Sequence, residues 1–245
     1  MKSKLLFLIG LILIVFNCSN TKNEIKITFF ETNDLHGNIM PVDYATGENV
    51  KYSLAHGVTI INQERKTNKN VVLIDCGDIL QGSPWIFYAN FIDEGFKSGK
   101  SQHFVAKAMN LLNYDAAAIG NHDIETGHNV YTNLALNTNL GFNFPFLAAN
   151  AVKEGTEEPY FKPFTIIESS GIKIGIIGLI EPAIPRSLPK EKWTGIDWKD
   201  CDEIANKYVP ILKEKNNCDV VVVIAHTGLD YNYNDSTIDN VKNRK

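Results

Sequence analysis

Short apolar runs alternate along the chain with segments whose apolar residues recur every three or four positions. The runs predict β-strands, and a fully apolar run such as V-V-L-I at residues 71–74 is typical of a strand buried on both faces. The periodic segments predict helices. The expected strands are residues 25–30, 71–74, 116–119, 146–149 and 220–224, and the expected helices are residues 56–68, 102–113, 130–137 and 201–213.

Later in the chain the alternation gives way to a hairpin. Two apolar segments, residues 164–168 and 172–180, flank the tripeptide S-S-G and predict a pair of antiparallel strands. Strands that alternate with helices and then meet a hairpin predict an α/β protein, a sandwich of mixed β-sheets flanked by helices. The proline-rich residues 181–189 are expected to form a loop, and Pro210 is expected to kink or end the last helix.

The first twenty residues have the pattern of an export signal. Two lysines precede an apolar core at residues 5–16, which is too short for a comfortable membrane span. Residues 15–18 (V-F-N-C) resemble a bacterial lipobox, in which Cys18 would be lipidated, although Asn17 stands where glycine or alanine is usual. Ordinary cleavage nearby and an uncleaved anchor are the alternatives. We exclude residues 1–20 from the fold and expect an exported protein, periplasmic or at the cell surface, whose membrane contact would be a lipid on Cys18.

Composition narrows the class of protein. The chain has 245 residues, 44% of them apolar, which fits one large globular domain. Its net charge is −4 with both signs mixed along the chain, which argues against binding to a nucleic-acid polymer. A mildly acidic protein can still bind phosphate when metal ions supply the positive charge. The sequence contains no C-x-x-C pair, so it does not indicate a zinc-thiolate site. A disulfide between Cys201 and Cys218 is an open alternative in an exported protein.

Four short polar motifs follow predicted strands in a fixed order. They are T-N-D-L-H-G-N at residues 32–38, D-C-G-D at 75–78, G-N-H-D at 120–123 and A-H-T-G at 225–228. Ligands of open α/β sheets gather beyond the carboxyl ends of the strands, so these side chains are expected to lie together. Each motif alone has an ordinary structural explanation, but four in order indicate a site for two metal ions that act on phosphate esters.

The first two motifs supply carboxylates and an imidazole. Asp34 and His36 are two positions apart and point the same way in an extended chain, so both could bind one cation. A turn aspartate and a surface histidine are the alternative. Asp78 has two oxygens and could bridge two cations, while Gly77 permits a sharp turn. Asp75 is expected to orient a ligand or the turn, or to cap backbone amides.

The last two motifs supply an amide and further imidazoles. Asn121 offers a neutral oxygen suited to Mn, Mg or Fe, and His226 would be an imidazole ligand for the second ion. His122 could instead face the substrate and donate a proton to the leaving oxygen, with Glu125 hydrogen-bonded to its ring. An ordinary turn with Asn121 or Asp123 as a helix cap, and a structural histidine at a strand end, are the alternatives.

Together the motifs resemble those of the calcineurin-like metallophosphoesterases. They resemble most the exported branch of 5′-nucleotidases, 2′,3′-cyclic-nucleotide phosphodiesterases and UDP-sugar hydrolases. The resemblance runs from about residue 25 to residue 229 and includes L-I-D-C-G-D-I-L-Q-G-S-P at 73–84 and M-N-L-L-N-Y-D-A-A-A-I-G-N-H-D at 109–123. It implies an enzyme that hydrolyses small phosphate esters, most specifically nucleotides, with two divalent metal ions. Mixed nitrogen and oxygen ligands do not choose among Mn, Zn, Fe and Mg.

The resemblance also implies a role for each residue. The metal ligands would be Asp34, His36 and Asp78 for the first ion, and Asp78, Asn121 and His226 for the second, with Asp78 bridging. His122 would be the catalytic histidine that faces the substrate. The family has an aspartate paired with this histidine, whereas Glu125 stands at the matching position here.

A second departure concerns the carboxyl-terminal side. The family continues with a G-G-H-x-H-like motif that completes both metal sites, and this chain reaches Lys245 without it. We therefore expect residues 24–245 to be a partial catalytic domain, from a longer protein or a truncated gene copy. The alternative function is an inactive or weakly active remnant that binds metal or phosphate without efficient turnover. A nuclease or protein phosphatase of the same superfamily is a third reading, disfavoured by the export signal.

Overall fold

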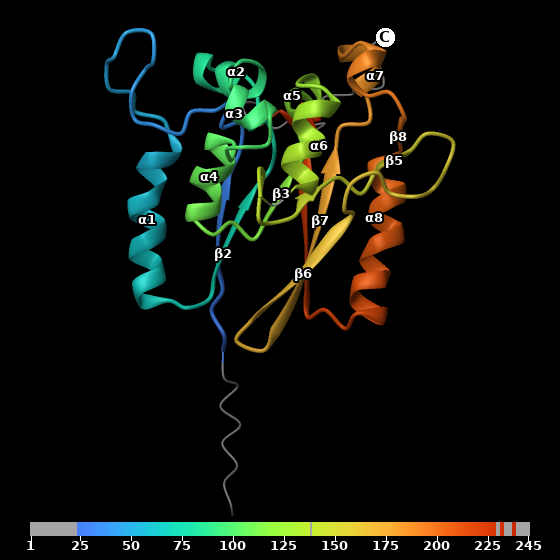
Figure 1. Cartoon of the computed structure of the whole chain (residues 1–245). Coiled ribbons are helices and arrows are strands. Elements are labelled where there is room, and N and C mark those ends of the chain that lie inside the picture. Colours follow the sequence, from blue (N-terminus) through green and yellow to red (C-terminus); the bar gives the residue numbers. More distant parts are fainter. Residues whose placement is uncertain (1–23, 138, 229–230, 233–236, 239–245) are drawn as a thin grey trace, which may run out of the picture.

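Two β-sheets form the centre of the molecule, as the computed structural model in Figure 1 shows. The first sheet is parallel, in the order β1 (Thr28–Thr32), β2 (Val71–Asp75), β3 (Ala116–Ala118), β4 (Phe146–Leu147). The second contains β6 (Phe164–Ser169), β7 (Ile172–Ile180) and β9 (Val220–His226), with β6–β7 antiparallel and β7–β9 parallel. Two short antiparallel pairs join β5 (Ala151–Lys153) to β8 (Ile196–Trp198) and β10 (Tyr231–Asn232) to β11 (Thr237–Ile238).

The helices cover the outer faces of the sheets. They are α1 (Leu54–Thr67), α2 (Pro84–Phe91), α3 (Glu94–Lys97), α4 (Phe104–Leu111), α5 (Asn121–Glu125), α6 (His128–Leu136), α7 (Ile184–Ser187) and α8 (Cys201–Pro210). Helix α1 lies on one side of the molecule and α8 on the other, while α2, α5 and α7 lie at the end toward which the parallel strands point (Figure 1). The predicted fold, a sandwich of mixed sheets flanked by helices, is confirmed.

Side chains alternate between the two faces of each strand, and this alternation produces the apolar layers on either side of the first sheet. Val72 and Ile74 of β2 pack against Ile174 and Ile176 of β7 between the two sheets. Leu73 lies between them in sequence and points to the opposite face, into the core beneath α1, α4 and α6. This follows from the two-residue repeat of a strand, in which successive side chains face opposite sides of the sheet.

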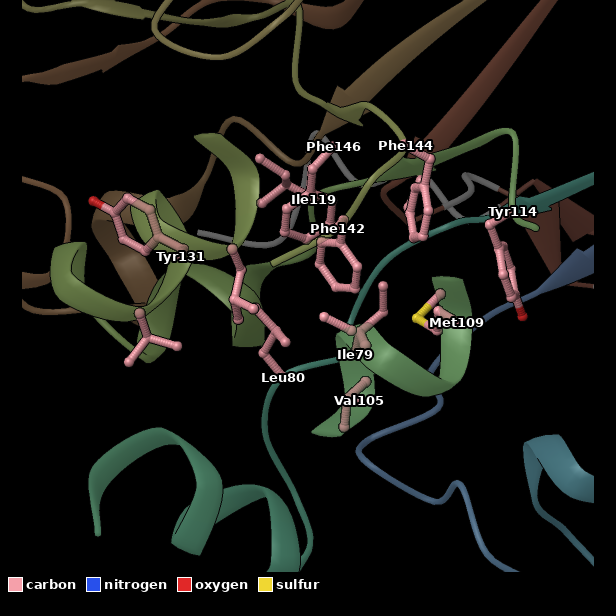
Figure 2. Packing of buried hydrophobic residues seen from close by; sticks show 14 of the residues in the cluster. Ile79, Leu80, Val105, Met109, Tyr114, Ile119, Tyr131, Phe142, Phe144 and Phe146 are labelled. Atoms are coloured by element: carbon pink, nitrogen blue, oxygen red, sulfur yellow. The ribbon is translucent and has the colours of Figure 1, made fainter. Parts of the chain in front are cut away.

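The largest core lies under the helices of the first sheet and anchors the motif that follows β2. Figure 2 shows Ile79 and Leu80 in this core, close to Met109 and Phe142. Phe142 packs against the rings of Phe144 and Phe146 at centroid distances of 4.8 and 5.2 Å. Because Ile79 and Leu80 are fully buried, they fix the backbone of the residue before them, Asp78.

The structure describes residues 24–137, 139–228, 231–232 and 237–238. The predicted export signal at residues 1–20, its Cys18 and most of the polar tail lie outside the described residues. Among the helices of the described part, none is both long and apolar enough to span a membrane. Cys201 and Cys218 are free thiols, so the disulfide that the sequence left open is not formed.

Several elements differ from expectation. Strand β1 begins and ends later than the predicted 25–30, because its pairing with β2 extends to Thr32 and Asp75. Residues 181–189 are not entirely a loop, since they contain the one-turn helix α7 with a proline in its first turn, where no backbone donor is required. Helix α8 ends at Pro210, as predicted, but the chain continues into a π-helical turn at Ile211–Lys215. Helices α2 and α3 and strands β5 and β8 were not predicted.

Candidate metal centre

The loops after β1 and β2 and the last residue of β9 bring acidic and imidazole side chains to one point. Asp34, Asp78 and His226 each offer one ligand atom, and these atoms all lie within 4.8 Å of one another. The Nε2 atom of His226 is 3.2 Å from Asp78 Oδ2 and 3.2 Å from Asn121 Oδ1. His36 lies beside them, with Nε2 3.7 Å from Asp34 Oδ1. All five side chains predicted as metal ligands are therefore neighbours.

Hydrogen bonds set the tautomer of both imidazoles. His36 Nδ1 is 2.7 Å from the carbonyl oxygen of Gln81, and His226 Nδ1 is 2.9 Å from that of Cys76. A carbonyl oxygen can only accept, so Nδ1 of each ring is the donor. Each Nε2 therefore faces the carboxylates, and once it is deprotonated it can offer its lone pair to a cation, which is the arrangement that metal-binding histidines use.

Three of the six described non-glycine residues with positive φ lie at this site. Asp34, His36 and Asp78 have φ of 50°, 48° and 58°, a left-handed conformation that side chains other than glycine rarely adopt. The first loop is held to the second by bonds from Asp34 N to Gly77 O, 3.1 Å, and from His36 N to Asp78 O, 2.9 Å. Such strain persists where the surrounding structure enforces it, typically at functional sites.

Two glycines allow the loops to meet. Gly77 has a φ of 105°, and a Cβ there would lie 2.7 Å from Gly120 N and 3.0 Å from His226 Nδ1. A Cβ on Gly120 would collide with the carboxylate of Asp78. Each glycine is thus required by close approach of the D-C-G-D, G-N-H-D and A-H-T-G segments.

Asp123 connects the second and third motifs. Its carboxylate accepts backbone N–H bonds from Gly120, Asp78, Ile79 and Leu80, at 2.8, 3.0, 2.8 and 2.8 Å. Complete burial and the nearby charge of Asp78 raise the pKa of Asp123 to about 6, although the backbone donors oppose the shift. The sequence predicted at most a helix cap here. The aspartate that ends the G-N-H-D motif was the only sequence feature that pointed to this role, and the sequence does not reveal which distant backbone amides it binds.

Asp75, the first residue of the second motif, is buried and bonded to the turn that follows it. It accepts from Gly77 N at 2.7 Å and from Thr32 Oγ1 at 2.5 Å, and that hydroxyl also bonds the phenol of Tyr114 at 2.8 Å. Burial raises the pKa of Asp75 well above its usual range. The structure therefore places Asp75 where it orients the turn.

Asp78 and His226 form the electrostatic centre of the site. Burial alone would raise the pKa of Asp78, but the hydrogen bond and charge of His226 outweigh it and hold that pKa below the usual value. Burial alone would likewise lower the pKa of His226, yet Asp78 chiefly raises it to about 9. The two groups favour each other's charged form, and a cation could replace the proton between them.

His122 and Glu125 are paired next to the ligands. His122 Nδ1 is 2.6 Å from Glu125 Oε2, and the two side chains are 37% and 38% exposed. The backbone N–H of His122 donates to Asp78 Oδ1 at 2.9 Å, and its ring lies 5.3 Å from the His36 ring. Glu125 thus reaches the histidine despite being one methylene longer than the family's aspartate.

A cavity of about 270 Å³ opens onto the ligands. It is lined by Asn33, Asp34, Glu181, His226, Thr227 and Gly228, among others. Glu181 follows β7, and its backbone N–H donates to His226 O at 2.8 Å. Sequence reasoning placed Glu181 in a loop and missed it. The donors that converge here are carboxylate and amide oxygens and imidazole nitrogens, a set that fits divalent cations of intermediate hardness.

Comparison with known proteins agrees with the fold and the motifs. The pattern that defines the calcineurin-like phosphoesterase family matches residues 27–244. The chain therefore belongs to the calcineurin-like phosphoesterases, as its motifs indicated.

Individual proteins of known name are also similar to this chain. The chain is 38% identical, over 84% of its length, to the 2′,3′-cyclic-nucleotide 2′-phosphodiesterase/3′-nucleotidase of Salmonella typhimurium, of which it covers 32%. It is 31% identical, over 83% of its length, to a 5′-nucleotidase of Vibrio cholerae, of which it covers 34%. The crystal structure of the calcineurin-like phosphoesterase YfkN from Bacillus subtilis has a TM-score of 0.74 and 28% identity, covering 88% of this chain and 66% of that one. The chain spans about a third of the length of the curated relatives it matches.

Proposed function

We propose that this domain hydrolyses phosphate esters of nucleotides with two divalent metal ions. The observation that carries the proposal is the convergence of Asp34, Asp78, Asn121 and His226 beside the His122–Glu125 pair. Family membership supports the reaction class. The printed names of the relatives, a cyclic-nucleotide phosphodiesterase and a 5′-nucleotidase, support nucleotides as the substrate class.

Each residue has a role in this proposal. The first ion would take Asp34, His36 and Asp78 as ligands, and the second would take Asp78, Asn121 and His226. When bound, such ions neutralise phosphate charge and lower the pKa of a bound water. The His122 ring would donate Nδ1–H to Glu125, and in its doubly protonated form its Nε2–H would face the substrate and be transferred to the leaving oxygen, leaving the ring neutral. Glu125 would hold the ring in place through this hydrogen bond.

Four substrates tested side by side would examine this proposal. We expect Mn²⁺-loaded protein to hydrolyse 2′,3′-cyclic AMP or 5′-AMP faster than UDP-glucose and far faster than a phosphopeptide. Asp78→Asn serves as the inactive control. Preference for the phosphopeptide would refute the nucleotide assignment. Metal binding with no turnover of any substrate would favour the weakly active remnant instead.

Export is the second part of the proposal. The apolar segment at residues 5–16 and the V-F-N-C sequence support a lipid anchor on Cys18. Cell fractionation should place the wild-type protein with membranes and Cys18→Ala in a soluble fraction. Identical distributions would argue against the anchor, and retention of both in the cytoplasm would argue against export.

A further inference from the structure

The outward side of helix α2 consists entirely of large apolar side chains. Its inward side is formed by the buried residues Ile86, Ala89 and Asn90. Successive residues of an α-helix are about 100° apart, so the other positions form one continuous arc on the outward side. This arc, which we call the α2 face, is between 41% and 57% exposed at each residue and contains Trp85, Phe87, Tyr88, Phe91 and Ile92. A contiguous exposed apolar patch of this kind marks an interaction surface.

The α2 face combines a recess with protruding rings. The recess has a volume of about 340 Å³ and is lined by Gln81, Gly82, Ser83, Phe87, Asn90 and Phe91, among others. The Phe87 and Phe91 rings on its wall are 5.1 Å apart. Trp85 and Tyr88 lie outside the lining, and the Trp85 ring is supported by that of Tyr44 at 5.1 Å. A surface that carries both a recess and adjacent rings can fit a copy of itself, with the rings of each copy in the recess of the other.

The charge distribution also suits pairing of identical surfaces. Residues 79–92 contain no charged side chain. In an interface with a two-fold axis, a residue near the axis faces its own copy, so a charge at that place would meet a like charge. The first charged residue after the α2 face is Asp93, which caps the next helix. A neutral aromatic centre with charges only at its edge is the usual composition of a protein–protein interface.

The exposed area of the α2 face is sufficient for a specific dimer. A large aromatic side chain presents about 150–250 Å² and the five residues are each about half exposed, so one copy offers roughly 500 Å². Two copies would together bury roughly 1,000 Å² from these side chains alone, which reaches the lower limit of specific protein–protein interfaces.

A membrane is a poorer partner for the α2 face. Helices that lie on membranes carry lysine and arginine on their polar side, and α2 contains neither. Figure 1 shows α2 at the end toward which the parallel strands point, whereas β1 begins at the other end. Cys18 precedes the first described residue, Glu24, by six positions, which span at most about 20 Å. A lipid on Cys18 would therefore hold the membrane at the end of the domain away from α2.

We infer that the α2 face is the interface of a homodimer, with a two-fold axis near Tyr88 and Phe91. This inference does not depend on the proposed hydrolysis. The recess shares no lining residue with the cavity of about 270 Å³ that opens onto the metal ligands. Pairing through α2 therefore leaves that cavity accessible in both copies.

Sedimentation equilibrium of the full chain with Cys18→Ala, which removes the site of the proposed lipid, tests the dimer. We expect a reversible dimer whose Kd rises about 30-fold or more in Phe91→Ala, the usual effect of truncating a central aromatic residue of an interface. Tyr88→Glu should give a monomer, because it places like charges against each other at the axis. Leu136→Glu is the matched control, since Leu136 is an exposed apolar residue on another helix, and it should dimerise as the parent chain does. Unchanged Mn²⁺ binding would show that each variant is folded.

Crosslinking of the anchored wild-type chain in intact cells tests the same interface in its membrane. A short bifunctional maleimide should link Tyr88→Cys into dimers, but neither Leu136→Cys nor the wild type with its native thiols. A parent chain that stays monomeric at every concentration would overturn the inference, as would equal dimerisation of Tyr88→Glu, which would place the contact on another face. A monomer that binds phosphatidylglycerol vesicles, and loses this binding in Tyr88→Glu, would overturn it in favour of a lipid surface.

Discussion

Asp78 occupies the most constrained position in the candidate centre. It is 3% exposed, has left-handed backbone, contacts His226 through one oxygen and accepts from His122 N through the other. Its backbone N–H is bound by Asp123, and the next two residues are buried in the core. These contacts together fix the position of the Asp78 backbone and the direction of its carboxylate. A fixed carboxylate suits the proposed role of a bridging ligand.

Asp78→Asn keeps the shape of this side chain and removes its charge. Changes to groups that merely support a metal ligand weaken binding about 10- to 100-fold, so loss of the bridging carboxylate should weaken Mn²⁺ binding by more than about 100-fold. Isothermal titration calorimetry measures the effect. Equal affinity in the variant and the wild type would exclude Asp78 as a ligand.

Substitution of His122 tests whether this residue binds the metal or acts on the substrate. In His122→Ala the metal affinity should stay within a few-fold of the wild type, while kcat falls about 10²- to 10⁴-fold, the usual contribution of a general acid. Glu125→Asp should retain much of the activity, because it restores the family's carboxylate. Loss of bound metal in His122→Ala would contradict the assigned role.

At the scale of elements, short strands end at a common edge and their loops are tied together. His103, the residue before α4, is fully buried and donates from Nε2 to Asn90 Oδ1 of α2 at 2.9 Å. The Asn90 amide donates in turn to Leu80 O, two residues after Asp78. This chain of bonds links the start of α4, helix α2 and the loop that carries Asp78.

His103 should make the stability of the domain depend on pH. Its Nδ1 has no partner within the described part of the chain, and burial lowers its pKa from 6.5 to about 4 although Asp93 opposes this. Between these values the unfolded chain binds a proton that the folded protein does not, so stability is lost as the pH falls. The loss through this window is up to about 3 kcal/mol.

Denaturant unfolding at pH 7.5, 6, 5 and 4 measures this contribution. His103→Gln keeps a donor for Asn90 but does not titrate, so its stability should fall less steeply with decreasing pH than that of the wild type. The difference between the two curves isolates His103 from the carboxylates that titrate in both. Parallel curves would show that His103 does not titrate in this way.

At the scale of the whole molecule, the two sheets must pack correctly before the site exists. His226 ends β9 in the second sheet, yet its ring bonds Cys76 O, 150 residues earlier, after β2 in the first sheet. The apolar layer between the sheets, including Ile74, Ile176 and Ile224, sets their separation. Metal binding and correct packing of the two sheets should therefore be coupled.

Divalent cations should stabilise the folded domain. A metal ion present at 100 times its Kd adds about 2.7 kcal/mol, which for a domain of this size corresponds to a rise in Tm of about 5–10 °C. Calorimetry of EDTA-treated protein with and without Mn²⁺, Zn²⁺ or Mg²⁺ measures the rise, and the largest shift identifies the preferred ion. Asp78→Asn should show little shift, whereas an equal shift would place the bound ion elsewhere.

Local patterns in the amino-acid sequence were enough to predict the main strands, the helices α1, α4, α6 and α8, and the residues that follow each strand. Apolar periodicity is a local property, and polar motifs at strand ends can be read without knowing what they face. Helix α2 escaped prediction because P-W-I-F-Y-A-N-F is apolar all round, so it has no periodic stripe. Strands β5 and β8 are short and pair with each other across more than forty residues.

How the motifs act together depends on the packing of the folded chain. Only the packed loops reveal that Asp123 binds four backbone amides, that His36 and His226 each donate from Nδ1 to a carbonyl oxygen, and that Glu181 lines the cavity. These facts depend on contacts between segments far apart in the chain, which no local pattern encodes. The sequence determined which chemical groups are present, and the packing of two sheets determined the distances and protonation that make them a site.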